Sequence, residues 1–228
     1  MRTAVLVPYR SDSGRRDELW KYTEEWLYYN HYSWPIYLGE SPEGPFNRGA
    51  AINDAARQAG GFDVAVVHDA DNISDPMLLE RAVQLAYEDR DCVFPFSKYL
   101  YLDEPSSNRL IYDDNWFVAP GTDSWSILPR HLSGVQAISH AAYDAVGGFV
   151  ELEGWGHEDI IMGTLLKTFT AGVRHLEGVA YHLYHGDTSP ERKVCGEINR
   201  QILADVLSLA PVPDQLRMYL QEGGHRIP

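Results

Sequence analysis

Three short segments of the sequence combine side chains that could bind a cation or move a proton. The first is His68-Asp69-Ala70-Asp71, which follows an apolar run at 64–67. If this segment is extended, the carboxylates of Asp69 and Asp71 point to the same side. Such a pair suits a hard divalent cation that also holds phosphate oxygens. The alternative is a solvated turn in which Asp71 or Asn72 caps the next element.

The second segment is Gly154-Trp155-Gly156-His157-Glu158-Asp159, which leads into an apolar helix predicted over 158–169. Glu158 and Asp159 fall in the first turn of that helix, where the macrodipole favours ionised carboxylates. One of them could accept a hydroxyl proton while Trp155, hinged by the glycines, covers a ligand. The alternative is plain helix capping, with Trp155 in the core.

The third segment is His182-Leu183-Tyr184-His185. Residues i and i+3 face opposite sides of a strand, so one metal can take both histidines only if the chain leaves β geometry near Leu183. Imidazoles beside carboxylates favour Mn²⁺ over Mg²⁺, since Mg²⁺ prefers oxygen ligands. The alternatives are histidines satisfied by hydrogen bonds, or a 2-His-1-carboxylate iron oxygenase built from His182, His185 and an aspartate.

Strands and helices alternate along the chain and must position these segments. The predicted strands cover 4–7, 35–38, 63–67, 92–96, 134–138 and 173–181, and the predicted helices cover 15–30, 47–59, 76–89, 140–146, 158–169 and 190–209. This order predicts an α/β fold with a mostly parallel sheet flanked by helices. Ligands of such sheets bind beyond the carboxyl ends of the strands, where Asp69 and Asp71 fall. Residues 97–130 lack clean periodicity and are predicted to be a functional loop.

Composition limits the class of protein. The chain has 228 residues, and its formal net charge of -14 disfavours general binding to nucleic acid or anionic lipid. Cys92 and Cys195 are too few for a disulfide scaffold, although one bridge between them stays open. With no apolar run of membrane-spanning length and no signal-peptide layout, we expect a cytoplasmic protein. We expect one domain over 1–210 and a C-terminal tail over 211–228; the oligomeric state stays open.

The motifs, taken in order, resemble the nucleotide-sugar glycosyltransferases of the GT-A fold, closest to the β-1,4-galactosyltransferase family and its N-acetylgalactosaminyltransferase relatives. The Trp-Gly-x-Glu-Asp match at 155–159 is the most specific. The other matching segments are Val7-Pro8-Tyr9-Arg10, Phe46-Asn47-Arg48-Gly49, Asp69-Ala70-Asp71, Ser133-Gly134-Val135-Gln136-Ala137 and His182-x-x-His185. The resemblance therefore spans most of the chain and implies a Rossmann-like nucleotide-diphospho-sugar transferase.

The resemblance also implies roles for individual residues. Pro8, Arg10, Phe46 and Arg48 would hold the nucleotide, with Phe46 against the base. Asp69 would contact ribose or metal; Asp71, His185 and, less firmly, His182 would ligate Mn²⁺, with Mg²⁺ as the alternative ion. Trp155 would cover the diphosphate and sugar, Glu158 would bind sugar hydroxyls, and Asp159 would be the base of an inverting displacement. The function implied is metal-dependent sugar transfer from a UDP-sugar to an acceptor hydroxyl.

The sequence departs from the family pattern at positions that bear on the substrates. His157 replaces a glycine, and Ile160 and Ile161 replace acidic residues, one of which helps to hold an N-acetylglucosamine acceptor in the family. The position aligned with donor choice falls near His131 or Leu132. Donor sugar and acceptor (glycan, protein or modified nucleobase) therefore stay open, with the net charge against DNA. A non-catalytic module that binds a nucleotide sugar or glycan is the alternative.

One further feature is a small basic spot formed by Arg15, Arg16 and Lys21. It could contact a phosphate. Its alternative is a solvated helix face.

Overall fold

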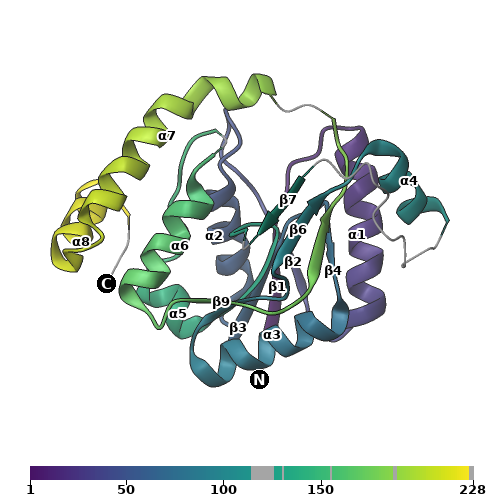
Figure 1. Ribbon diagram of the computed structural model, residues 1–228, viewed down its shortest axis with the longest axis horizontal. Helices are drawn as coiled ribbons and strands as arrows, with labels where there is room; N and C mark the ends of the chain where they lie inside the picture. The colour runs from purple at the N-terminus through teal and green to yellow at the C-terminus, as the bar shows by residue number, and fades with distance from the viewer. Residues whose placement is uncertain (114–125, 130, 155, 187–188, 226–228) are drawn as a thin grey trace.

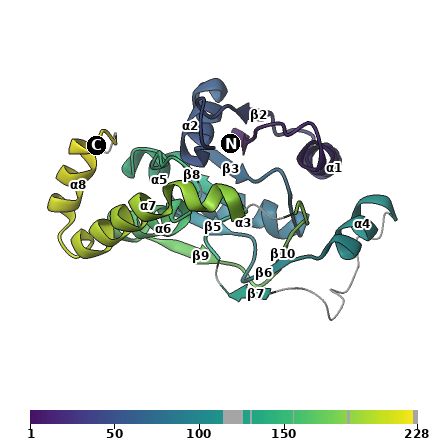
Figure 2. The ribbon, with the colours of Figure 1, turned by 90° about the horizontal axis from the view of Figure 1, so that it is seen from above.

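The structure is a computed structural model. It describes residues 1–113, 126–129, 131–154, 156–186 and 189–225. A central sheet is flanked by helices, and α7 and α8 lie at the opposite end of the molecule from α1 and α4 (Figures 1 and 2). The predicted α/β architecture is confirmed.

The main sheet has six strands in the order β2-β1-β3-β8-β5-β9. Its members are β1 (Thr3–Pro8), β2 (Ile36–Gly39), β3 (Val64–His68), β5 (Cys92–Phe94), β8 (Val135–Ser139) and β9 (Val173–His175). Only β8 runs against its neighbours, because it pairs antiparallel with both β3 and β5. Every residue of β1 and β3 is buried, as expected for strands that are covered on both faces.

A second, smaller sheet extends from the carboxyl edge of the first. Its order is β4-β10-β6-β7, with β4 (Asn72–Ser74), β6 (Lys98–Tyr101), β7 (Ser126–Pro129) and β10 (Val179–His182). Two predictions are wrong here. The span 97–130 is not one loop, because it contains β6, β7 and a helix. The strand predicted over 173–181 is two strands, β9 and β10, in different sheets, because a turn containing Gly178 separates them.

All helices except α4 and α8 were predicted, and their boundaries follow the prediction closely. They are α1 (Arg15–His31), α2 (Arg48–Ala59), α3 (Pro76–Asp89), α4 (Glu104–Tyr112), α5 (His140–Ala145), α6 (Glu158–Phe169), α7 (Ser189–Leu209) and α8 (Pro213–Glu222). Local chemistry explains the close match. Asn47 caps α2 through the amide of Ala50, and Gly60 ends that helix in the left-handed conformation.

Several elements besides β6 and β7 were not predicted from the sequence. Strand β4 has only three residues and α4 lies in a stretch without clean periodicity. In addition, the predicted tail contains α8, whose Leu216 and Leu220 are buried. No described helix combines the length and apolar character that crossing a bilayer requires.

Candidate functional site

The connection between β3 and β4 carries the two aspartates of the first motif. It is a turn, in which the Asn72 amide donates to the Asp69 carbonyl at 3.3 Å and the Asp69 amide donates to the Gly134 carbonyl at 2.8 Å. The segment is therefore not extended, and the turn that the sequence offered as the alternative is present. Because the chain turns at Ala70, the carboxylates of Asp69 and Asp71 serve different partners.

Asp71 forms a cluster with two histidines that lie more than a hundred residues further along the chain. Its Oδ2 lies 3.7 Å from Nε2 of His182 and 3.6 Å from Nε2 of His185. One possible ligand atom from each of these three residues lies within 4.8 Å of the other two. Among the described residues, this is the one group of three acidic, histidine or cysteine side chains close enough to hold a metal ion.

The second sheet creates this cluster. Strand β10 pairs antiparallel with β4, opposing His182 to Asn72. The strand then ends, and the Leu183 amide donates to the Asp71 carbonyl at 2.8 Å, which brings His185 back to the same carboxylate. The departure from β geometry near Leu183 was predicted as the condition for both histidines to meet one metal. The structure meets that condition.

The electrostatics of the cluster keep Asp71 ionised. Burial acts to raise the pKa of Asp71, but His182, His185 and Arg16 outweigh it, and the pKa lies below its ordinary value. Burial lowers the pKa of His185, although Asp71 opposes this shift. Neutral imidazole and ionised carboxylate are the forms that bind metals. One oxygen and two nitrogen donors fit Mn²⁺ better than Mg²⁺.

Asp69 belongs to a second group, which is organised by Arg48. Arg48 is the first residue of α2 and is 8% exposed. Its Nη2 lies 2.7 Å, and its Nε 2.9 Å, from Oδ1 of Asp69. Ser133 donates from Oγ to the other oxygen of Asp69 at 3.4 Å. Burial acts to lower the pKa of Arg48, but Asp69, Glu158 and Asp159 together raise it, so the guanidinium is held ionised.

Glu158 and Asp159, in the first turn of α6, interact electrostatically with Arg48. Burial raises the pKa of Glu158, the nearby Arg48 opposes that shift, and Asp159 adds to it. Asp159 and Asp69 also act on His131, whose pKa is lowered by burial. His157 caps α6 with φ of 75°, a left-handed conformation that non-glycine residues adopt rarely. It is the residue that replaces a glycine of the family pattern.

The remaining predicted residues lie at the ends of β1 and of the loop before α2. Pro8 ends β1, whose neighbour in the sheet is β3. Arg10 donates to the carbonyls of Pro42 and Gly44, and its guanidinium lies 5.4 Å from the centre of the Phe46 ring. Trp155 lies outside the described residues.

Comparisons with known proteins agree with this architecture. No protein-family model matches the chain, and no curated protein matches it either. Among solved structures, Drosophila β-1,4-galactosyltransferase 7 with manganese, UDP-Gal and xylobiose has a TM-score of 0.57 at 16% identity, over 87% of this chain and 79% of that one. S. aureus TarS with UDP-GlcNAc has a TM-score of 0.55 at 16% identity, over 93% of this chain and 66% of that one. The chain has the GT-A fold. The fold inferred from the motifs is thereby confirmed.

Two sets of contacts at this site were not predicted from the sequence. Tyr99 donates to Oδ1 of Asn72 at 2.6 Å, and its ring lies 4.5 Å from that of His131. Asn199 of α7 donates to the carbonyls of Glu153 and Gly156 at 3.1 and 3.4 Å, holding the loop before α6. No local pattern predicts these contacts, because each joins elements that are distant in sequence.

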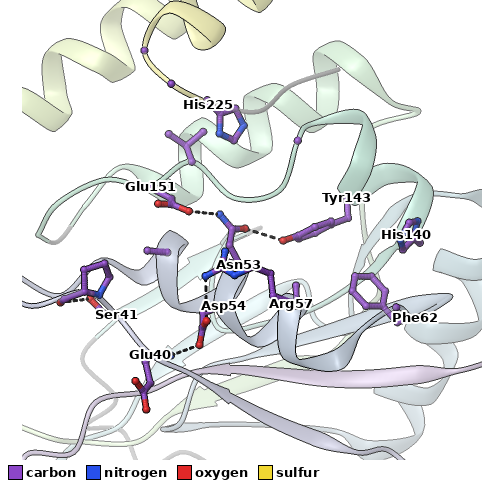
Figure 3. Close-up of a pocket in the computed structure, with 18 residues that line it drawn as sticks. Glu40, Ser41, Asn53, Asp54, Arg57, Phe62, His140, Tyr143, Glu151 and His225 are labelled. Atoms are coloured by element: carbon purple, nitrogen blue, oxygen red, sulfur yellow. Dashed lines mark hydrogen bonds and ion pairs between the residues drawn. The ribbon is translucent and has the colours of Figure 1, made fainter.

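A hollow of about 1020 Å³ lies elsewhere on the GT-A domain, between α2, α5 and the C-terminal segment (Figure 3). Its polar groups bind one another: Asn53 donates to Glu151 and accepts from Tyr143, and Asp54 accepts from Arg57. Asp71, His182 and His185 do not line it.

Cys92 is a free, buried thiol.

Proposed function

We propose that this protein is a metal-dependent inverting glycosyltransferase that moves a sugar from a UDP-sugar to an acceptor hydroxyl. The observation that supports this most is the meeting of Asp71, His182 and His185 at the carboxyl edge of a GT-A sheet. Neighbours of the same fold were solved with manganese and UDP-Gal, or with UDP-GlcNAc. We assign 1–210 to the catalytic domain and 211–228 to a C-terminal extension.

Asp71, His182 and His185 are the residues that would hold Mn²⁺. When bound, the ion supplies Lewis-acid stabilisation of the charge that develops on a nucleoside diphosphate leaving group. We include His182 in the ligand set because its Nε2 is about as far from Asp71 Oδ2 as that of His185 (3.7 and 3.6 Å).

The nucleotide-binding residues are Pro8, Arg10, Phe46, Arg48 and Asp69. Phe46 offers a partly exposed ring for the base. Arg48 binds Oδ1 of Asp69 through two nitrogens, so a ribose hydroxyl would bind Oδ2, which also accepts from Ser133 at 3.4 Å. We therefore place Asp69 on the ribose rather than on the metal. Trp155 would cover the diphosphate and the sugar.

The general base of the proposed reaction lies in the first turn of α6. Asp159 would take the proton of the acceptor hydroxyl as it attacks the anomeric carbon, a role typically worth about 10²–10⁴ in rate. Glu158 would bind sugar hydroxyls, as the resemblance to the family implies for this position. The acceptor is a glycan, a protein or a modified nucleobase, and the net charge of -14 disfavours DNA.

A screen for UDP release tests the proposal. Purified protein is mixed with Mn²⁺, single UDP-sugars and pools of glycans, peptides or hydroxymethylated DNA. We expect one donor to give acceptor-dependent UDP release that EDTA abolishes. UDP-sugar binding with neither transfer nor hydrolysis would instead support the non-catalytic binding module.

The same donor set also fits a 2-His-1-carboxylate iron centre. Such centres usually line β-rich barrels, whereas this chain has a GT-A sheet. Turnover that requires Fe(II) and 2-oxoglutarate would overturn the glycosyltransferase proposal.

A further inference from the structure

We infer that Arg16 binds the diphosphate of the nucleotide sugar and stabilises the nucleoside diphosphate as it leaves. This inference rests on the proposed function and adds a catalytic residue to it. Arg16 lies in the first turn of α1, outside the motifs that carry the family resemblance.

The first turn of α1 is fixed against the chain next to the cation cluster. Arg15 donates from Nε to the Tyr184 carbonyl at 3.2 Å, and from Nη2 to Oδ1 of Asn108 at 2.7 Å. The Tyr184 amide in turn donates to Ser107 Oγ at 2.8 Å. Residue 184 directly precedes His185, so these contacts place the start of α1 beside a residue of the cluster. Arg15 is thereby a positioning residue, and its charge is already paired with Glu18 at 2.6 Å.

Arg16 differs from Arg15 because its charge has no ion-pair partner among the residues that the structure describes. Its backbone amide donates to both carboxylate oxygens of Asp12, at 3.2 and 3.3 Å. Within the described ranges, its guanidinium has neither a hydrogen bond nor an ion pair, although the residue is half-buried. A partly buried cation without a counterion is unfavourable, so an anion at this place would be stabilised.

Arg16 lies close to the cation cluster formed by Asp71, His182 and His185. It follows Arg15 in the first turn of α1, and the hydrogen bond from Arg15 to the Tyr184 carbonyl holds that turn against the chain one residue before His185. A guanidinium and a divalent cation in this position repel each other, and an anion between them offsets the repulsion. A diphosphate provides that anion, because its oxygens can bind the metal on one side and accept hydrogen bonds from Arg16 on the other.

In the transfer, the bond between the anomeric carbon and the diphosphate oxygen breaks, and its electron pair stays on that oxygen. The acceptor oxygen forms the new bond to the anomeric carbon, and its proton goes to Asp159. Negative charge therefore grows on the diphosphate as the bond breaks. Arg16 is placed to donate hydrogen bonds to the oxygens that receive this charge.

Calorimetric titration of UDP, UMP and Mn²⁺ into the wild type and three variants tests this role. Arg16→Gln removes the charge, and Arg16→Lys keeps it without the planar fork. Lys21→Gln removes a charge from an exposed position of the same helix. With Mn²⁺ present, we expect Arg16→Gln to weaken UDP binding about 10- to 100-fold, with a smaller effect on UMP. Arg16→Lys should fall between, and Lys21→Gln should match the wild type.

Mn²⁺ binding without nucleotide supplies the discriminating control. Arg16→Gln should bind Mn²⁺ as tightly as the wild type or more tightly, because a repelling charge is gone. Equal UDP affinity of wild type and Arg16→Gln would overturn the inference and leave the proposed function standing. Weaker Mn²⁺ binding in Arg16→Gln would also overturn it, because it would show a structural role in the cluster. Failure of the wild type to bind UDP with Mn²⁺ would instead overturn the proposed function.

Discussion

The Arg48 guanidinium lies 2.7 Å from Oδ1 of Asp69, whereas Asp71, two residues further on, faces two histidines. The turn at Ala70 thus divides a single Asp-x-Asp motif between two tasks. Asp69 binds Arg48, whose pKa is also raised by the carboxylates of α6. The other aspartate, Asp71, is available to a cation.

Loss of the Arg48 side chain should destabilise the fold. Arg48→Met leaves Asp69 without its charge partner in a largely buried place, which typically costs about 3 kcal/mol. Urea unfolding measures the change. Adding Asp69→Asn to Arg48→Met should restore part of the loss. Arg57→Met, in the exposed pair with Asp54, is the control and should change stability by less than about 1 kcal/mol. Strictly additive effects of the Arg48 and Asp69 changes would contradict the coupling.

The two aspartates should respond differently to Mn²⁺. Mn²⁺ at about a hundred times its Kd should stabilise the wild type by about 2.7 kcal/mol, seen as a higher Tm. Asp71→Asn should abolish this shift, because it removes the one carboxylate of the cluster. Asp69→Asn should retain it. Equal loss in both variants would show that Asp69 is also a ligand.

Asp159→Asn should lower turnover by at least about 10² while UDP-sugar affinity stays nearly unchanged, because only proton transfer is lost. Initial rates and calorimetric titration measure the two quantities. Asp214→Asn is a matched control, since Asp214 also lies in the first turn of a helix. It should leave the rate unchanged. Near-normal turnover of Asp159→Asn would remove the assignment of the base.

Two buried histidines should make the protein sensitive to mild acid. Burial lowers the pKa values of His31 and His68 to about 4 from 6.5. Between these values the unfolded chain binds protons that the folded chain does not, so stability should be complete above about pH 6.5 and should fall as the pH drops towards 4. Each histidine contributes at most about 3 kcal/mol. Denaturant unfolding from pH 7.5 to 4.5 measures this slope.

His31→Phe should flatten the slope, because Phe binds no proton in either state. The ring can still stack on Trp34 as the imidazole does, at 4.1 Å between ring centres. His140→Phe, at a half-exposed position, should not. An unchanged slope in His31→Phe would show that His31 does not contribute to the acid sensitivity.

Gly134→Ala should lower the stability of the protein and also weaken Mn²⁺ binding at the candidate site. Gly134 has φ of 91°, and a Cβ there would lie 2.5 Å from Cε2 of Tyr99. The change should lower the free energy of unfolding by roughly 1–3 kcal/mol. It should also reduce Mn²⁺ binding, because the Gly134 carbonyl accepts a hydrogen bond from the Asp69 amide in the turn that leads to Asp71. Gly172→Ala is matched for φ (114°) but has open space, so it isolates the backbone strain. Equal losses in the two variants would show that contact with Tyr99 does not matter.

Local patterns predicted most of the main sheet and the helix boundaries. The apolar runs of β1 and β3 and the caps Asn47 and Gly60 act within a few residues, so their signal is complete in the sequence. The second sheet was largely missed. Strand β4 has three residues, and it is a strand because β10 pairs with it.

The sequence by itself determined which residues have the chemistry for the site: carboxylates after β3, carboxylates in the first turn of α6, and a histidine pair at the end of the last strand. Only the tertiary structure decided how they divide the work. The turn at Ala70 separated Asp69 from Asp71, and the β4–β10 pairing brought His182 and His185 to Asp71. The physical reason is that residue type and spacing fix what a side chain can bind, whereas its partners depend on long-range strand pairing that no local pattern encodes.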